Sequence, residues 1–280
     1  MPDAPLTIGL IAGGKQFPVL VAQGVKSKGH RLVVAGFTGH TNMDVVPLAD
    51  EWMELKFGKL NKLIGYLKSN GVDRLIMAGT IEKPKVMDVR HLDMRAIKLI
   101  LGKKNRGDSA LLGILAEEFE KEGMPVVPAH EFLPELLTPD GVLTRREPDE
   151  REWKDLNFAW TMAKELGRLD IGQCVVVNEG VVAAVEAIEG TDEAIRRGCS
   201  YGGKGCVVVK VFKPGQQKEV DLPSLGLDTL RTMADGQATC LGVEAGKSLF
   251  FDREAALGFA DANNISIVGL TGESFSLKGD

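Results

Sequence analysis

The sequence predicts an α/β fold with two domains: a first domain built on a parallel sheet and a second α/β domain joined to it by a hinge. Two patterns support this prediction. Short apolar runs alternate with amphipathic segments through the first half of the chain, and alternation of strands and helices favours a parallel sheet. The second half opens with a helical pattern and continues with several Val-rich runs, as a separate α/β domain would.

Three short runs rich in Leu, Ile and Val are expected to be strands of the first domain. They lie at residues 6–12, 31–37 and 74–80. The two helices between them are expected to end at Gly29 and Gly71, because glycine adopts the left-handed conformation that closes a helix. The rest of this Rossmann-like unit is two helices and a strand, expected at residues 93–104, 109–123 and 124–129.

A polar, proline-bearing stretch at residues 137–155 is typical of a linker or hinge. We therefore place the domain boundary near residue 140, which gives domains at residues 1–139 and 140–280. The second domain is expected to begin with a helix at residues 156–170, followed by strand-rich segments with helices among them.

Composition narrows the class of protein. A hydrophobic fraction of 44% suits a folded core, and a net charge of -5 with an acidic pI argues against nucleic acid as a partner. Lys15 is the first basic residue, so the positively charged start of a secretory signal is lacking. We therefore expect a cytoplasmic location. No apolar run approaches the roughly 18 residues of a spanning helix, so membrane contact would be peripheral. The four cysteines lack CxxC spacing and are expected to be reduced.

Gly13 and Gly14 follow the first predicted strand and precede a helix. In that position a glycine turn lets backbone amides and a helix N-terminus meet a phosphate. The spacing is not GxGxxG, and the second strand ends at Gly36 and Phe37 without an acidic residue for a ribose, which weakens a dinucleotide interpretation. A tight turn without a ligand is the alternative.

Two stretches, residues 198–205 and 242–248, approach the phosphate-loop motif and depart from it. The first has Gly205 where the motif needs Ser or Thr, and the second is one residue short. Each leads into a strand pattern where the motif requires a helix, so neither is expected to be a phosphate loop.

Three carboxylates meet at one predicted turn of the second domain: Glu186 and Glu189 close a strand, and Asp192 opens a helix. Magnesium prefers one or two carboxylates with waters and phosphate oxygens, so this turn is a candidate metal site. The alternative is helix capping, with Thr191 as the N-cap and Asp192 favouring the helix dipole.

Asp221 lies directly before Leu222 and Pro223, where the proline ends regular strand pairing and would turn the carboxylate toward a cleft. Lys210 and Lys213, just upstream, offer ammonium groups to phosphate oxygens. Their alternative is two solvated lysines on an edge strand.

A basic run precedes Asp108 and Ser109, either of which can cap a helix whose exposed amides bind an anion. The run comprises Lys103, Lys104 and Arg106 and is equally typical of a solvated face. His130 ends a predicted strand and is a candidate ligand contact or a structural residue.

Eight stretches, in this order, resemble the signature blocks of the UDP-2,3-diacylglucosamine pyrophosphatase family of lipid A synthesis. They are IAGGKQFP, AGTIEKP, GDSALLGIL, PVVPAHEFLPELL, EGTDEAI, VKVFKPGQ, DLPSLGLDT and GVEAGKSLFFDRE. The resemblance spans nearly the whole chain. The combination of EGTDEAI, VKVFKPGQ and DLPSLGLDT is the most specific part.

The resemblance implies a reaction and a setting. The reaction is hydrolysis of the diphosphate of UDP-2,3-diacylglucosamine to UMP and 2,3-diacylglucosamine 1-phosphate, with Mg²⁺ or Mn²⁺. It implies a homodimer acting peripherally at the cytosolic face of the inner membrane. The lipid-linked nucleotide sugar would lie between a substrate-binding first domain and a catalytic second domain.

The resemblance also implies residue roles. Asp221 would be essential, holding the metal or orienting water, with Lys210 as a second catalytic residue. The other implied metal ligands are Glu186, Glu189 and Asp192. Substrate-binding residues would be Gly13, Gly14, Lys15, Gly79, Thr80, Asp108, Ser109, His130, Thr191 and Lys213. The family usually has a third glycine at the position of Lys15.

Two other functions fit the same sequence features. A non-catalytic sensor or carrier of a nucleotide sugar would bind in a two-domain cleft without turnover. A dinucleotide-dependent oxidoreductase would use the first glycine turn and would bind NAD or NADP.

Overall fold

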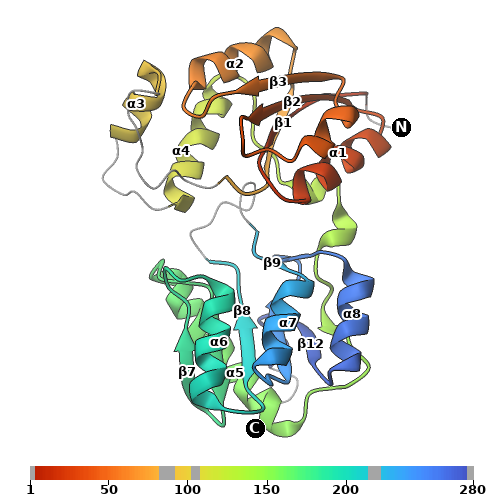
Figure 1. Ribbon diagram of the computed structural model, residues 1–280, viewed down its shortest axis with the longest axis vertical. Coiled ribbons are helices and arrows are strands. Elements are labelled where there is room, and N and C mark those ends of the chain that lie inside the picture. Colours follow the sequence, from red (N-terminus) through yellow and green to blue (C-terminus); the bar gives the residue numbers. More distant parts are fainter. Residues whose placement is uncertain (1–3, 82–91, 102–107, 214–221, 276–280) are drawn as a thin grey trace. The chain divides into compact units, whose positions relative to one another are not determined.

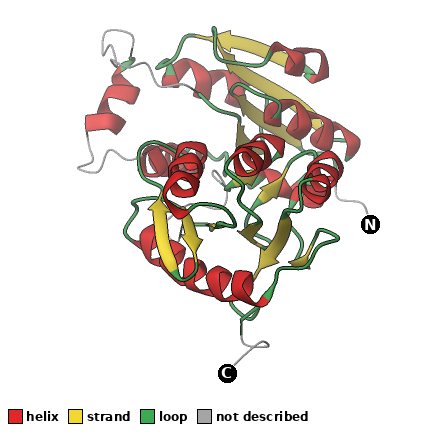
Figure 2. Cartoon of the chain, turned by 60° about the horizontal axis from the view of Figure 1, so that its bottom comes forward, coloured by secondary structure: helices red, strands yellow, loops and turns green. Residues whose placement is uncertain are grey.

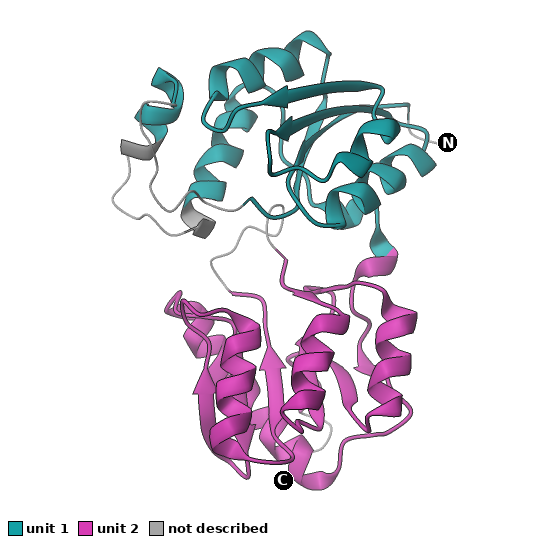
Figure 3. Cartoon of the chain, viewed as in Figure 1, with its two compact units in different colours: residues 1–134, 217–221 teal, residues 135–216, 222–280 magenta. Residues whose placement is uncertain are grey.

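The computed structural model describes residues 4–81, 92–101, 108–213 and 222–275 (Figure 1). Within these ranges the chain forms two compact units, and it passes from the first to the second between Pro134 and Glu135 (Figure 3). Each unit is a sheet with helices packed on it, so the predicted α/β class with two domains is confirmed. Of the described helices, none has the length and apolarity required to cross a membrane.

The first unit contains a four-stranded sheet of order β3-β2-β1-β4, in which every pairing is parallel. The strands are β1 Thr7–Ala12, β2 Arg31–Phe37, β3 Glu51–Leu55 and β4 Arg74–Ala78. The helices are α1 Phe17–Ser27, α2 Leu60–Ser69, α3 Met94–Leu101 and α4 Asp108–Lys121. Short 3-10 helices are η1 Met43–Leu48 and η3 Ala129–Glu131, and η4 Pro134–Leu136 spans the passage to the second unit.

Helices cover both faces of this sheet. Buried side chains of α2, α3 and α4, such as Leu67 and Phe119, share one apolar cluster with Val33 and Ala35 of β2. The buried residues of α1 lie outside that cluster, and α1 packs on β1, β2 and β4 from the other face. This is the doubly wound arrangement in which ligands bind beyond the carboxyl ends of the strands.

One expectation for this unit was wrong, and one strand was missed. Residues 124–129 do not form a strand: Val126 makes only an isolated bridge with Leu75, because Pro125 and Pro128 have no N–H to donate to a ladder. Strand β3 had not been expected. Its sequence, EWMEL, has polar residues at Glu51 and Glu54, three positions apart, so it lacks the strict polar and apolar alternation that signals a strand.

The second unit contains a six-stranded mixed sheet of order β5-β12-β10-β8-β6-β7. Its strands are β5 Gly141–Val142, β6 Cys174–Asn178, β7 Val181–Val185, β8 Val207–Lys210, β10 Cys240–Glu244 and β12 Ser266–Leu270. A separate parallel pair consists of β9 Ser224–Leu225 and β11 Leu249–Phe250. Strands β8, β10 and β12 are parallel, and β6 runs antiparallel to both β8 and β7. The carboxyl ends of β7, β8, β10 and β12 therefore share one edge.

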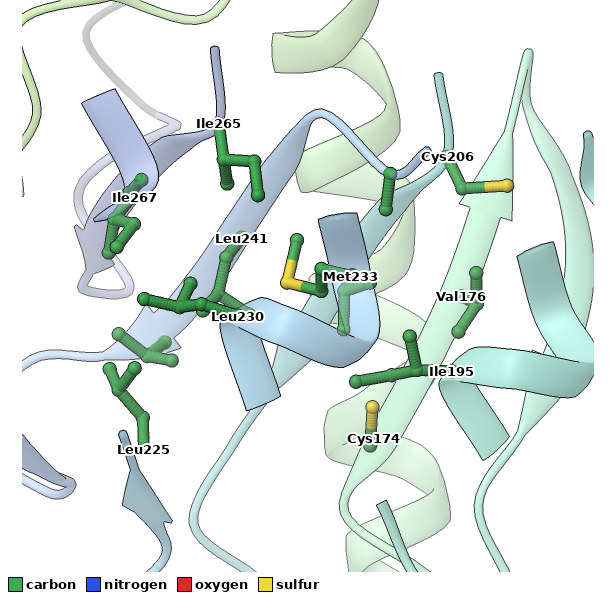
Figure 4. Packing of buried hydrophobic residues seen from close by; sticks show 14 of the residues in the cluster. Cys174, Val176, Ile195, Cys206, Leu225, Leu230, Met233, Leu241, Ile265 and Ile267 are labelled. Carbon is green, nitrogen blue, oxygen red and sulfur yellow. The ribbon is translucent and has the colours of Figure 1, made fainter. Parts of the chain in front are cut away.

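The second sheet is also covered on both faces (Figure 2). Apolar residues of α5 (Glu150–Arg168), such as Leu156, pack on one face. On the other face Ile195, Leu230 and Met233 belong to one apolar cluster with Val176, and Ile195 lies beside Val176 (Figure 4). The helices that supply this second layer are α6 Thr191–Gly202, α7 Leu227–Asp235 and α8 Arg253–Ala262.

Helix α5 begins six residues earlier than expected, so part of the predicted polar linker is helical. Asp149 accepts a hydrogen bond from the backbone N–H of Glu152, and the Glu152 side chain accepts one from the backbone of Asp149. This capping box starts the helix within a charged stretch, whose low hydropathy had indicated a loop. The Glu152 carboxylate is buried and is also paired with Arg146.

Candidate functional site

The predicted glycine turn lies at the carboxyl edge of the first sheet. The residues after β1 and β4, which are neighbouring strands, cross there: Gly13 N donates to Ala78 O and Gly14 N to Thr80 O, both at 2.8 Å. A Cβ on Gly79 would lie 2.6 Å from the Gly14 carbonyl oxygen, and one on Gly13 would lie 2.8 Å from that of Thr80. The glycines are therefore needed for this close crossing. Their two amides are bonded within the protein rather than left for a phosphate.

Lys15 adopts a left-handed backbone conformation, with φ of 65°. Only glycine takes this conformation without steric cost, which explains physically why a third glycine suits the position. Asn42, which the sequence analysis missed, holds the turn: its N–H donates to Gly13 O and its Nδ2 to Lys15 O, at 3.1 and 3.0 Å. The Lys15 side chain is exposed at this edge.

The other predicted site residues of the first unit, Asp108, Ser109 and His130, come later in the sequence than the glycine turn. His130 lies in the short helix η3 and is half-buried. Asp108 and Ser109 are the first described residues of α4, and the positions of their side chains lie outside the described part of the structure, so their predicted role as a helix cap stays a prediction.

Lys210 is the last residue of β8, at the carboxyl edge of the second sheet, and is 8% exposed. Its Nζ donates a hydrogen bond of 2.9 Å to the carbonyl oxygen of Ser224. Among the residues that the structure describes, no carboxylate lies within 4.0 Å of this ammonium group. Burying an ammonium group is unfavourable by several kcal/mol unless hydrogen bonds or nearby negative charge offset the lost hydration.

Glu186 follows β7 at the same edge and is buried. Its carboxylate accepts hydrogen bonds from Gln173 N at 3.1 Å and Thr191 Oγ1 at 3.0 Å. The expectation that Thr191 caps α6 was wrong: Gly190, with φ of 86°, is the N-cap and Thr191 is the first helical residue. Asp192 lies in the first turn of α6, where a carboxylate favours the helix dipole.

A buried thiol, that of Cys174, lies at the same edge. Cys174 pairs with Lys210 across β6 and β8. Burial raises the pKa of the Cys174 thiol, the negative charges of Glu186 and Asp192 raise it further, and the positive charge of Lys210 lowers it. Lys210 and Glu186 thus lie at the carboxyl edge of the second sheet, and Asp192 lies in the first turn of the helix that follows β7.

Lys213 forms an ion pair of 2.9 Å with Asp170. The stretches at residues 198–205 and 242–248 are a helix end with its turn and a strand with its turn, which confirms that neither is a phosphate loop. Asp221, the predicted essential carboxylate, lies outside the described residues.

The described residues do not by themselves make a metal site. In residues 4–81, 92–101, 108–213 and 222–275, no three His, Cys, Asp or Glu side chains are placed to share a metal ion. Glu189 accepts a hydrogen bond from Ala187 N and is paired with Arg197, and both oxygens of Glu186 accept hydrogen bonds. A magnesium site at this edge would require carboxylate oxygens beyond these.

A buried ionic cluster at the same edge was missed by the sequence analysis. Glu244, the last residue of β10, is 3% exposed and is paired with Lys164 of α5 and Lys247, each at 2.9 Å. Burial alone raises the pKa of Glu244, but the hydrogen bonds from the two lysines outweigh this and hold the pKa below its ordinary value. Lys164 lies 80 positions from Glu244 in sequence, so no local motif signals the pair.

The fold defines a class of two-domain α/β proteins with a parallel sheet in the first unit and a mixed sheet in the second. Comparison then gives the family. Residues 7–136 match the family model of the LpxI N-terminal domain, and residues 139–268 match that of the LpxI C-terminal domain.

The UDP-2,3-diacylglucosamine pyrophosphatase LpxI of Caulobacter vibrioides is 35% identical over 278 residues, which cover 94% of this chain and 97% of that protein. The chain belongs to the LpxI family of hydrolases, and the resemblance seen in the sequence is confirmed.

Solved structures are far less similar. The crystal structure of gox2253 is 13% identical with a TM-score of 0.31, covering 96% of this chain and 91% of that one. Phosphoribosylglycinamide synthetase from Anaerococcus prevotii is 10% identical with a TM-score of 0.27. That match covers 69% of this chain, which spans about a third (34%) of the synthetase. Likenesses this low support no argument about function.

Proposed function

We propose that this protein hydrolyses the diphosphate of UDP-2,3-diacylglucosamine to UMP and 2,3-diacylglucosamine 1-phosphate in lipid A synthesis. The name of the Caulobacter vibrioides relative supports the substrate and reaction. The observation that carries the proposal is Lys210, a buried ammonium group at a carboxyl strand edge with no carboxylate partner among the described residues. A bound diphosphate would place negative charge beside this ammonium group.

The Lys210 ammonium has three N–H donors, and Ser224 O takes one. In this proposal the others bind diphosphate oxygens, and the N-terminus of α6 adds a favourable dipole at the same edge. Both interactions strengthen as charge develops on the leaving phosphate, which is how phosphoryl transfer is mainly catalysed.

Asp221 is proposed to orient the attacking water. It precedes Ser224 by three residues, so the chain alone keeps the two Cα atoms within about 11 Å of each other. The water oxygen bonds to phosphorus as the bridging P–O bond breaks, and the displaced phosphate oxygen leaves with the bond's electron pair. The water proton passes to the carboxylate and then to solvent.

Dependence on Mg²⁺ or Mn²⁺ is proposed from the family resemblance, with Asp221, Glu186, Glu189 and Asp192 as the ligands to test. A bound metal would supply positive charge to the diphosphate. The remaining substrate contacts are also proposed on the resemblance. They are Gly13, Gly14, Lys15, Gly79, Thr80, Asp108, Ser109, His130, Thr191 and Lys213.

Lys210→Met is expected to lower kcat by about 100-fold, because one preorganised donor to the developing charge is lost. The thermal midpoint of unfolding should stay the same or rise, because the substitution removes the free-energy cost of desolvating a buried cation. Steady-state release of UMP and circular dichroism measure the two effects. Lys204→Met, which removes an exposed lysine of the same unit, is the matched control and should retain activity. Near-normal kcat in a folded Lys210→Met protein would refute the role of Lys210.

Peripheral membrane contact is proposed through two adjacent loops of the second unit, which we call the apolar loops. They expose Leu169, Ile171 and Ile188, with 58%, 47% and 104% of their surface accessible. A Cβ on Gly172 would lie 2.0 Å from the Glu186 carbonyl oxygen, so the two loops touch. Apolar side chains grouped at a polar edge are typical of a lipid contact. They lie at the edge that holds Lys210.

Ile188→Asp is expected to weaken binding to vesicles of phosphatidylethanolamine and phosphatidylglycerol by about tenfold or more. A loss of this size corresponds to the free energy gained when one such side chain is buried. Vesicle flotation measures this. Tyr201→Asp changes a comparably exposed residue at the far end of α6 and should leave binding unchanged. Equal effects of the two substitutions would contradict the assignment to the apolar loops.

The proposed homodimer is tested separately by sedimentation equilibrium.

A further inference from the structure

The main-chain ladder between β8 and β10 ends at the pair of Lys210 and Val243, and side chains continue it. Phe212, two residues beyond β8, donates its N–H to Glu244 Oε2 at 2.9 Å, and its carbonyl oxygen accepts from Lys164 Nζ at 3.4 Å. On the opposite side Val211 N is bonded to Gln173 O. The Lys164–Glu244 ion pair therefore forms hydrogen bonds with both backbone polar groups of Phe212, its N–H and its carbonyl oxygen. We call this arrangement the Phe212 clamp.

The clamp joins three elements. Lys164 belongs to α5, Glu244 ends β10, and Phe212 continues β8. Lys164 also lies 5.3 Å from the ring centre of Trp160, which limits its freedom. A carboxylate buried to this degree is favourable only when its lone pairs are filled, and here two lysines and one amide fill them.

We propose that Glu244 is a positioning residue for the reaction. It acts through Phe212 without touching the substrate: it fixes residues 211–213, so that Lys210 and Lys213, on either side of this segment, keep fixed places at the carboxyl edge. This inference rests on the proposed function, because Lys210 is the group proposed to meet the diphosphate. Misplacing such a group by about 1 Å lowers a rate by about 10²-fold.

Glu244→Gln and Glu152→Gln form a matched pair of substitutions. Glu152 is a similarly buried carboxylate of the same unit, paired with Arg146, but its partner Thr239 precedes β10 at the opposite edge of the sheet. Both variants are expected to lower the thermal midpoint. Only Glu244→Gln is expected to lower kcat, by about 10- to 100-fold with KM within about threefold. Its Phe212 amide should also exchange hydrogen about tenfold faster than in the wild-type protein.

Lys164→Met provides a second variant if Glu244→Gln does not fold. It removes the donor to Phe212 O and leaves Lys247 paired with Glu244, so a smaller loss of kcat in the same direction is expected. Equal loss of kcat in Glu152→Gln and Glu244→Gln would overturn the proposal, as would wild-type kcat in either clamp variant. Unchanged exchange at Phe212 would overturn the clamp itself. A wild-type protein that does not hydrolyse the substrate would instead refute the proposed function, and with it the positioning role.

Discussion

Asp221→Ala is expected to lower kcat for UDP-2,3-diacylglucosamine by about 10³-fold or more while the protein stays folded. The carboxylate is proposed to orient the attacking water or to hold the metal, and either contribution acts in the transition state. A group that acts only there changes kcat rather than KM. Release of UMP gives kcat, and circular dichroism confirms folding.

Asp228→Ala is the control for Asp221→Ala. Asp228 lies in the first turn of α7, seven positions further along the chain, and its side chain is 91% exposed. Its removal should change kcat by less than about twofold, since surface ion pairs contribute little. Normal turnover by folded Asp221→Ala protein would remove that residue from the mechanism.

Arg146→Met is expected to destabilise the second unit by about 3–5 kcal/mol, the loss typical when one partner of a buried ion pair is removed. Arg146 donates to both oxygens of Glu152, at 2.8 and 2.9 Å, and the Glu152 side chain is 2% exposed. Urea denaturation at neutral pH measures the change. Arg145→Met removes a 91% exposed partner of Asp261 and should change stability by less than about 1 kcal/mol.

The stability gap between wild type and Arg146→Met should narrow in acid. Burial raises the pKa of Glu152, but hydrogen bonds from Arg146 and Thr239 outweigh it, so the folded-state pKa is lower than the ordinary value of 4.5. A carboxyl group with a lowered pKa stabilises the fold above its unfolded pKa and loses that contribution as pH falls through its folded pKa. A gap that stays constant from neutral pH to about pH 3 would contradict this account.

Local patterns in the sequence were enough to predict most of the first sheet. The run at residues 31–37 coincides with β2, because a strand buried on both faces is continuously apolar. Gly29 and Gly71 adopt φ of 76° and 67°, as the predicted helix ends require. The strand order of the second sheet could not be predicted, because antiparallel and parallel pairings are mixed and join strands distant in sequence.

The candidate site was predictable where residues follow strands and not where pairing is remote. Gly13 and Gly79 were placed at strand ends by motif, and the parallel sheet brings those ends together. Lys164 and Glu244 were missed because a partner 80 positions away leaves no local pattern. Thr191 was assigned as a cap because sequence alone did not show that Gly190 takes the left-handed conformation before α6.

The central claim is tested most directly by incubating the purified protein with UDP-2,3-diacylglucosamine in detergent micelles, with Mg²⁺ or with EDTA. We expect UMP and 2,3-diacylglucosamine 1-phosphate to appear in equal amounts with Mg²⁺, and neither to appear with EDTA. Tight binding of the nucleotide sugar without either product, in the presence of Mg²⁺ or Mn²⁺, would contradict the claim and identify a carrier or sensor instead.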